Sequence, residues 1–470
     1  MWAVEKDPAL RSDFTNITVL EGRPDEERIR AKVAAALDVI PRLRQRVVSP
    51  PLRLAPPEWC DDPTFDLDYH LRRVSLPAPG RMRELLDLAA TLSSTPLDRS
   101  RPLWAFTLVE GLEGGRVALL QQVHHTITDG VGGLRLSLSL VDLEPEPAEA
   151  PTVAAGIAAE VAAQEQAATE ADPVPRTSPL DVVGDAIGWA IRTNARLAGR
   201  SVAAAARLAS HPTEVPARAA DAVALAASIR RQLLITDAAR SPLLASRSLA
   251  RRYEVFQAPL DEAKAAARRL GGTLNDLYVT GVAGALGIYH ERMGMPCDEL
   301  RMAMPVSLRT GGEVGGEADG GANQFAPTRL MVPLQPKEPA PRFERVHEAL
   351  ATVRAEPVLS AAGPLSALLA PLPTALLVNV ARSQSRSVDF ATSNLRGSPV
   401  PLYLGGQHIV ASFPMGPRSG VALNVTMLSY ENSLDMGLNL DPGAITDPAA
   451  LVAAMTESFE GLLDSSGSAT

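Results

Sequence analysis

Two stretches of alternating helix and strand patterns, separated by an alanine-rich stretch, most strongly constrain the fold of this 470-residue chain. Apolar residues at helical spacing lie at 25–40, 82–92, 260–270, 274–290, 342–354 and 451–463. Strand patterns lie at 103–111, 116–123, 300–306, 328–334, 401–410, 420–430 and 434–440. Because helices and strands alternate in both stretches, we expect an α/β fold with a mixed sheet flanked by helices in each half.

The composition changes near Glu144, and this change predicts the domain organisation. From there to about Ala250, alanine dominates and strand formers are rare, which indicates a helical connection. We therefore expect an N-terminal half at residues 1–145, an Ala-rich helical connection at 146–250 and a C-terminal half at 251–470.

Charge and cysteine content exclude several classes of protein. The formal net charge is −9, so no general basic surface attracts nucleic acid, and we expect no nucleic-acid partner. The two cysteines, Cys60 and Cys297, are too few for a disulfide scaffold or a cysteine-built zinc site, and the H-E-x-x-H pattern of zinc hydrolases is absent, so we expect no metal. The N-terminus shows no basic and apolar secretory signal, which predicts a cytoplasmic protein.

Two segments carry patterns that suit a lipid surface. The uncharged run 357–381 is long enough to cross a bilayer, but prolines interrupt it, so we expect two short packed helices or an apolar surface patch. At 192–207, four arginines share one side of a helical pattern, with Trp189 beside them. This row is either the solvated face of a packed helix or a basic helix lying on a membrane.

The sharpest motif is QQVHHTITDGVGG at 121–133. Histidine is the side chain best suited to accept a proton near neutral pH, and neighbouring residues of a strand point to opposite faces. We therefore expect one of His124 and His125 to act as a base and the other to be structural. Asp129 either orients the imidazole or forms an ion pair with Arg309 or Arg44, and Gly130 permits a close backbone approach.

HHTITDG resembles the HHxxxDG signature of acyltransferases related to chloramphenicol acetyltransferase and to peptide-synthetase condensation domains. Six further segments narrow the resemblance to the bacterial bifunctional wax ester synthase/diacylglycerol acyltransferases. They are FDLDYHLR at 65–72, RPLW at 101–104, Asn275-Asp276, MPVSLR at 304–309, ANQF at 322–325 and SNLRGSPVPLYLGG at 393–406.

The resemblance implies a two-domain, chloramphenicol-acetyltransferase-like fold and the esterification of diacylglycerol or long-chain alcohols by fatty acyl-CoA. His125 would be the general base and would take the proton of the acceptor hydroxyl, with no acyl-enzyme intermediate. His124, Asp129 and Gly130 would support it. Acyl-CoA would be a substrate and no cofactor is implied, and a protein with such substrates would visit a membrane or lipid-droplet surface peripherally.

The resemblance also implies further residues around the site. Asn275, Asp276, Arg309 and Asn323 would support it, Ser393 or Asn394 would stabilise the oxyanion, and Pro102, Leu103 and Trp104 would line the substrate channel. Two of these have alternatives. Thr273-x-x-Asp276 is also a capping box at a helix start, and Trp104 also fits ordinary core. TSNLRGSP departs from the family's more usual Asn-Val-Pro-Gly-Pro run.

Other functions share parts of the pattern. A transferase that takes its acyl group from a carrier protein would have the same fold and histidines, and a lipid-binding protein on this fold would have lost the activity. The spacing of His124 and Asp129 also matches glycerolipid acyltransferases of another fold, but their Glu-Gly-Thr-Arg segment is absent. No G-x-S-x-G segment supports a serine hydrolase.

Overall fold

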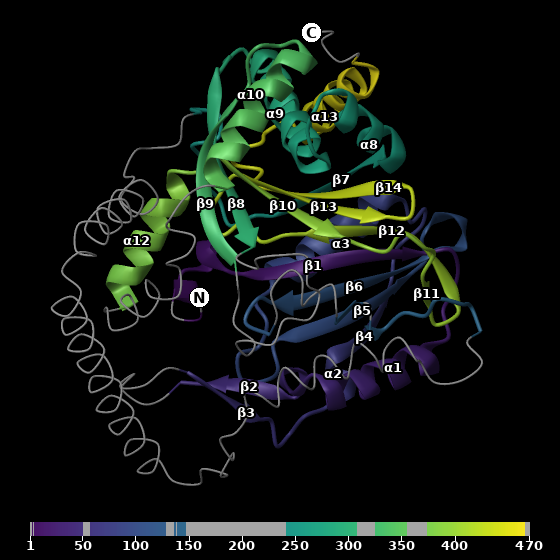
Figure 1. The fold of residues 1–470 in the computed structure, drawn as a ribbon. Helices are drawn as coiled ribbons and strands as arrows, with labels where there is room; N and C mark the ends of the chain where they lie inside the picture. The colour runs from purple at the N-terminus through teal and green to yellow at the C-terminus, as the bar shows by residue number, and fades with distance from the viewer. Residues whose placement is uncertain are drawn as a thin grey trace, which may run out of the picture.

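The computed structural model describes residues 2–49 other than Ala3, 57–127, 136–146 other than Leu138, 241–307, 325–354 and 374–465. Within them the chain builds two six-stranded sheets, one above the other in Figure 1, with helices packed against them. The arginine row at 192–207 and nearly all of the Ala-rich connection lie outside the described residues, so those predictions stay predictions.

The first sheet has the strand order β11-β12-β1-β6-β5-β4. Its strands are β1 (Asp13–Leu20), β4 (Leu71–Ser75), β5 (Trp104–Glu110), β6 (Val117–His124), β11 (Tyr403–Leu404) and β12 (Gln407–Met415). β4 runs parallel to β5 and the other neighbours are antiparallel, so the sheet is mixed. Because β11 and β12 come from the C-terminal half, this sheet joins both halves of the chain. A separate pair, β2 (Gln45–Val48) and β3 (Glu58–Asp61), lies apart from it in Figure 1.

The second sheet has the order β7-β14-β13-β10-β8-β9. Its strands are β7 (Arg252–Pro259), β8 (Glu299–Ser307), β9 (Phe325–Pro333), β10 (Phe390–Arg396), β13 (Leu423–Tyr430) and β14 (Ser433–Leu440). β10 is parallel to both of its neighbours, β8 and β13, and the remaining pairs are antiparallel. The expectation of a mixed sheet in each half is therefore confirmed.

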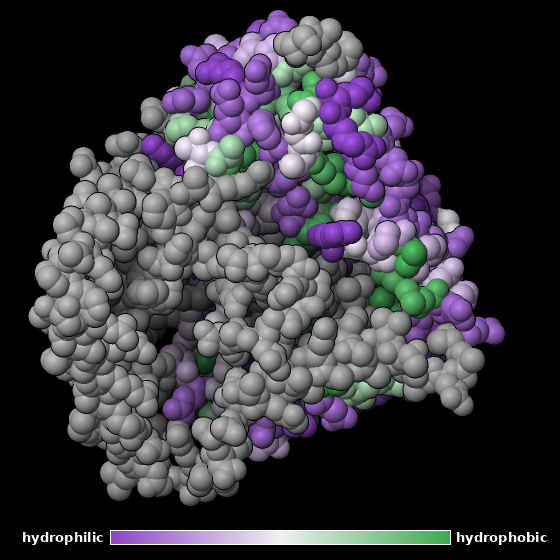
Figure 2. Space-filling view, viewed as in Figure 1, coloured by the Kyte–Doolittle hydropathy of each residue, from purple (hydrophilic) through white to green (hydrophobic). Residues whose placement is uncertain are grey.

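Helices cover the sheets, and all of them except α2 and α12 lie where the apolar spacing predicts. They are α1 (Glu26–Val39), α2 (Leu67–His70), α3 (Met82–Ser94), α8 (Leu260–Arg269), α9 (Leu274–Arg292), α10 (Pro339–Arg354), α12 (Thr374–Arg386) and α13 (Pro448–Asp464). α1 begins where Asp25 accepts hydrogen bonds from the first free backbone N–H groups. The helices α8, α9, α10 and α13 gather above the second sheet, and Figure 2 shows mostly hydrophilic side chains over this end of the molecule.

α9 is the central helix of the C-terminal core, because it is buried on nearly all sides. Its residues Leu277, Val282 and Leu286 are fully buried between the second sheet and α13. Glycine allows this close packing: a Cβ atom at Gly281 would lie 2.4 Å from the Phe459 ring. A helix that packs so closely fixes the position of its own N-terminus, where Asn275 and Asp276 lie.

Alternation along β1 defines the two faces of the first sheet. Ile17 and Val19 are buried against α3, in a core that also contains Leu120 of β6. Phe14 and Asn16 point to the opposite face, toward the second sheet, where the structure has its large cavity. The two halves are tied together beside this cavity, because Arg251, directly before β7, forms two hydrogen bonds to the buried Asp13 carboxylate.

The uncharged run at 357–381 is described only from residue 374, where α12 begins, so the expectation of two short packed helices is not settled by the described residues. Leu376 and Val380 of α12 are 47% and 44% exposed, which places two large apolar side chains on its surface. Among the described helices, none combines the length and the apolar character needed to span a bilayer.

Candidate active site

The register between β1 and β6 decides where the two histidines lie. β6 ends at His124, which pairs with Asp13, and His125 continues the register because its backbone N–H donates to the Ser12 carbonyl at 3.2 Å. Side chains alternate along β6, so His125 shares its face with Gln121 and lines the cavity. The Phe14 ring lies beside the His125 ring, with 5.0 Å between their centroids.

His124 points the other way, into a buried polar pocket. Its Nδ1 accepts the Thr126 backbone N–H at 3.1 Å, and its Nε2 donates to the Glu5 carboxylate at 2.5 Å. His124 and Glu5 have exposed side-chain fractions of 7% and 2%. The two histidines therefore lie on opposite faces, as the strand pattern predicts.

The Glu5 carboxylate is held in its charged form although it is buried. Burial favours the neutral acid, but the hydrogen bond and charge from His124, a hydrogen bond from Ser12 and the charge of Arg99 together lower the pKa of Glu5 below its usual value. Ser12 also binds the His125 backbone, so the same group of contacts fixes both histidines. This arrangement gives His124 a positioning role.

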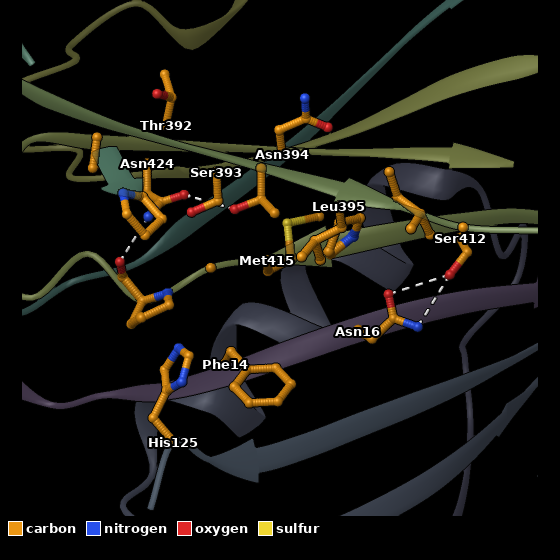
Figure 3. A pocket seen from close by; sticks show the side chains of 18 of the residues that line it. Phe14, Asn16, His125, Thr392, Ser393, Asn394, Leu395, Ser412, Met415 and Asn424 are labelled. Atoms are coloured by element: carbon orange, nitrogen blue, oxygen red, sulfur yellow. Dashed lines mark hydrogen bonds between the residues drawn. The ribbon is translucent and has the colours of Figure 1, made fainter. Parts of the chain in front are cut away.

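A cavity of about 1090 Å³ lies between the two sheets, next to His125. Its walls come from β1, β6, β8, β9, β10, β12, β13, α9 and α12, and many of the side chains are apolar, including Leu119, Leu140, Leu395, Met415 and Leu428. Figure 3 shows some of the lining side chains, among them Leu395 and Met415. This volume lies at the upper end of the range for ligand sites in proteins, and an apolar lining suits an aliphatic chain.

His125 is the single His, Asp, Glu, Cys or Lys among the described residues that line the cavity. The other ionisable side chains there are arginines and tyrosines. Burial and the charge of Arg301 lower the pKa of Arg329 to about 10, and burial raises the pKa of Tyr278 far above its usual value. Within the described lining, His125 is therefore the side chain best suited to exchange a proton near neutral pH.

Ser393 and Asn394 both border the cavity, but on different faces of β10. Figure 3 shows Ser393 on the side of the strand that faces His125, while Asn394 lies on the opposite side. The Asn394 amide donates to Asn275 Oδ1 at 3.2 Å, so these two residues meet at the start of α9. Ser393 is consequently better placed than Asn394 to contact a group bound at His125.

Asp276 is fully buried and performs the capping role that its spacing predicts. Its carboxylate accepts the Thr273 backbone N–H and hydroxyl, each at 2.8 Å, and Thr273 in turn accepts the Asp276 backbone N–H. The carboxylate also lies 2.9 Å from Nδ1 of His347 on α10. Asp276 is absent from the described cavity lining, so it supports the site through α9.

Pro102, Leu103 and Trp104 are buried, but they are absent from the described lining of the cavity. Trp104 stacks on His70 with 4.4 Å between ring centroids and donates to the Leu43 carbonyl at 2.7 Å. The structure thus favours the core alternative for Trp104 over the predicted channel wall. Leu103 still touches the site indirectly, because its carbonyl accepts the His124 backbone N–H.

Four predicted site residues, Asp129, Gly130, Arg309 and Asn323, lie outside the described residues. The structure also adds residues that the motif analysis missed, namely Glu5, Ser12, Phe14, Asn16 and Gln121. The alternating run Asp13–Leu20 could have shown the strand that carries two of them, but no local signal connects Glu5 with His124. Among the described residues, no three His, Cys, Asp or Glu side chains cluster in a way that could hold a metal ion.

The fold defines the class of protein. The chain superimposes on the first condensation domain of the CDA synthetase with a TM-score of 0.55 at 18% identity, covering 99% of this chain and 94% of that one. It superimposes on a wax ester synthase/diacylglycerol acyltransferase from Marinobacter aquaeolei with a TM-score of 0.58 at 21% identity, covering 96% and 94%. The superpositions therefore confirm the expected two-domain, chloramphenicol-acetyltransferase-like fold.

Sequence comparison defines the family. Residues 13–278 match the wax ester synthase/diacylglycerol acyltransferase catalytic domain, and residues 321–463 match the C-terminal domain of the same family. A Mycobacterium tuberculosis protein assigned by name as a diacylglycerol O-acyltransferase is 34% identical over 98% of this chain and 90% of its own length. A second from the same species is 30% identical over 90% and 86%. The chain belongs to the wax ester synthase/diacylglycerol acyltransferase family and is an acyltransferase.

Proposed function

We propose that this acyltransferase moves a fatty acyl group from acyl-CoA to the hydroxyl of diacylglycerol or of a long-chain alcohol, with His125 as general base. The observation that carries the proposal is the position of His125: it directly follows β6 and lines an apolar cavity of about 1090 Å³ between the sheets. The name shared by the mycobacterial relatives supports diacylglycerol as an acceptor.

The chemical step needs one proton acceptor and one group that donates a hydrogen bond to the oxyanion. His125 takes the proton of the acceptor hydroxyl as its oxygen attacks the thioester carbonyl, and the resulting oxyanion accepts a hydrogen bond from Ser393. When the carbon–sulfur bond breaks, His125 returns the proton to the CoA sulfur, so the reaction closes without an acyl-enzyme intermediate. His124 and Glu5 hold the strand end in place.

The proposal includes a peripheral association with a membrane or lipid droplet. The proposed substrates of the protein partition into lipid. The exposed Leu376 and Val380 of α12 supply apolar side chains that could contact the lipid surface. The formal net charge of −9 opposes binding to anionic lipid, so we expect neutral lipid surfaces to be preferred.

The test measures CoA release from palmitoyl-CoA with dioleoylglycerol or hexadecanol as acceptor. Replacing the base, His125→Ala, is expected to lower kcat by a factor of about 100 or more, because general bases contribute rate factors of this size. His408→Gln is the matched control, since His408 contacts Glu431 and is absent from the described cavity lining. Full activity of a folded His125→Ala variant would refute the assignment of the base.

Two further measurements distinguish the alternative functions, a carrier-dependent transferase and a lipid-binding protein. If acyl carrier protein supports turnover and palmitoyl-CoA does not, the chain is a carrier-dependent transferase. If neither donor is used while lipid still binds, it is a lipid-binding protein on this fold. Mixing the enzyme with radiolabelled palmitoyl-CoA in the absence of an acceptor should leave no label on the denatured protein, because no acyl-enzyme forms.

A further inference from the structure

Three polar side chains from neighbouring strands of the first sheet meet in the cavity, away from His125. Asn16 on β1, Gln121 on β6 and Ser412 on β12 all line the cavity, and we call these three residues the polar band. The Asn16 amide donates to Gln121 Oε1 at 3.3 Å and to Ser412 Oγ at 3.1 Å. Figure 3 shows Asn16 and Ser412 at one end of the cavity and His125 at the other.

Gln121 is the member of the band with hydrogen-bonding capacity to spare. Its Oε1 accepts from Asn16 and also from Ser137 Oγ at 3.1 Å, which fixes the amide plane. Its Nε2 has no hydrogen-bond partner among the described residues, although the residue is only 4% exposed. Because Gln121 lines the cavity, an acceptor oxygen on a bound ligand could pair with this donor.

The sheet register gives the distance between the band and the reacting group. Gln121 and His125 lie on the same face of the same strand, four residues apart, with Phe14 and Val123 forming the row between them. At about 3.3 Å per residue, the separation is about 13 Å. An extended aliphatic chain covers this span with roughly ten carbon–carbon bonds, because each bond of about 1.5 Å advances a zigzag by less than its length.

We propose that the polar band recognises an in-chain oxygen, a keto or hydroxyl group, about ten carbons from the reacting carbon of the chain bound in the cavity. Gln121 Nε2 donates the hydrogen bond to this oxygen, and Asn16 and Ser137 hold the amide in position. The inference rests on the proposed function, because it places the reacting carbon at His125. It adds a substrate class, oxygenated long chains, to the acyl-transfer activity.

The chain that reaches the band belongs either to the acyl donor or to the acceptor alcohol, and the experiment has one arm for each. In the donor arm, stearoyl-CoA is compared with 6-oxo-, 10-oxo- and 14-oxo-stearoyl-CoA, with hexadecanol as acceptor. In the acceptor arm, palmitoyl-CoA is combined with octadecanol or with its 6-oxo, 10-oxo and 14-oxo derivatives. Keto groups are used because they accept a hydrogen bond without supplying a second hydroxyl for acylation.

In one of the two arms, the 10-oxo chain is expected to exceed both the unsubstituted chain and the 6-oxo and 14-oxo chains by about tenfold in kcat/KM. The ratio of kcat/KM between two chains is taken within each enzyme variant, so a general loss of activity cancels. Gln121→Leu should abolish the preference. The nearly isosteric Gln121→Glu keeps the side-chain shape but replaces the donor with a carboxylate, so it should reverse the preference even if Gln121→Leu does not fold.

The outcomes distinguish this inference from the proposed function. If the wild-type protein turns over stearoyl-CoA but shows no preference for the 10-oxo position in either arm, the role of the polar band is refuted while the acyltransferase activity stands. If the preference survives in Gln121→Glu, the assignment to Gln121 is refuted. If no substrate releases CoA, the proposed function itself has failed.

Discussion

The contact between His124 and Glu5 provides a sharp test of how the site is held. Replacing the acid, Glu5→Ala, removes the acceptor that lies 2.5 Å from His124 Nε2, where both side chains are more than nine-tenths buried. A buried donor left without its partner costs about 1–3 kcal/mol. The Arg99 ion pair adds little, because the Arg99 side chain is 41% exposed. We therefore expect the free energy of unfolding to fall by about 2 kcal/mol.

Urea denaturation followed by circular dichroism at pH 7 measures this change. Glu5→Gln retains an acceptor oxygen without the charge and should lose about 1 kcal/mol. Glu21→Ala is the matched control, because the Glu21 side chain is 71% exposed, and its effect should stay within about 0.5 kcal/mol. If Glu5→Ala behaves like Glu21→Ala, the carboxylate does not hold His124 and the reasoning is wrong.

The same contact predicts a pH dependence. The folded structure lowers the pKa of Glu5, since burial is outweighed by His124, Ser12 and Arg99. A lowered pKa stabilises the folded protein fully above the unfolded value of 4.5, and this stabilisation is lost as the pH falls from there through the folded value. The stability difference between the wild type and Glu5→Ala should therefore shrink below pH 4.5.

Two other substitutions test the packing between and within the halves. Asp13→Ala should lower the free energy of unfolding by about 3–5 kcal/mol, because it leaves the buried Arg251 guanidinium without its carboxylate. Asp13→Asn should lower it less. Equal effects of the two substitutions in urea denaturation would contradict this reasoning. Gly284→Ala should cost about 1–3 kcal/mol, because its Cβ would lie 2.3 Å from Ser458 Oγ. Gly287→Ala is its control on the same helix, since the nearest atoms lie at 3.6 Å, and it should be neutral or stabilising in thermal denaturation.

Local patterns predicted the elements that have strong periodicity. The helical spacing at 25–40 and the capping box at Thr273 appear in the structure close to the expected positions. β1, β7 and β10 were not predicted as strands. Their runs mix polar and apolar residues, and only the cavity and the neighbouring strands explain that mixture.

The candidate site divides in the same way. The pair His124-His125 predicted one histidine on each face of the strand, because alternation of side chains along a strand is a local property. The core position of Trp104, by contrast, depends on His70 and Leu43, which lie far from it in sequence. The motif match alone therefore predicted that Trp104 lines the channel, whereas the described lining of the cavity does not include this residue.

The sequence by itself determined the mixed α/β class, the family and the presence of one histidine on each face of a strand end. Only the tertiary structure showed what holds His124 away from the cavity, namely Glu5, which lies 119 residues before it in the sequence. It also decided that β12 of the C-terminal half joins β1, which brings Ser412 beside Asn16. Periodicity reports the contacts that neighbouring residues share, whereas strand order and register between distant segments are set by the packing of the whole chain.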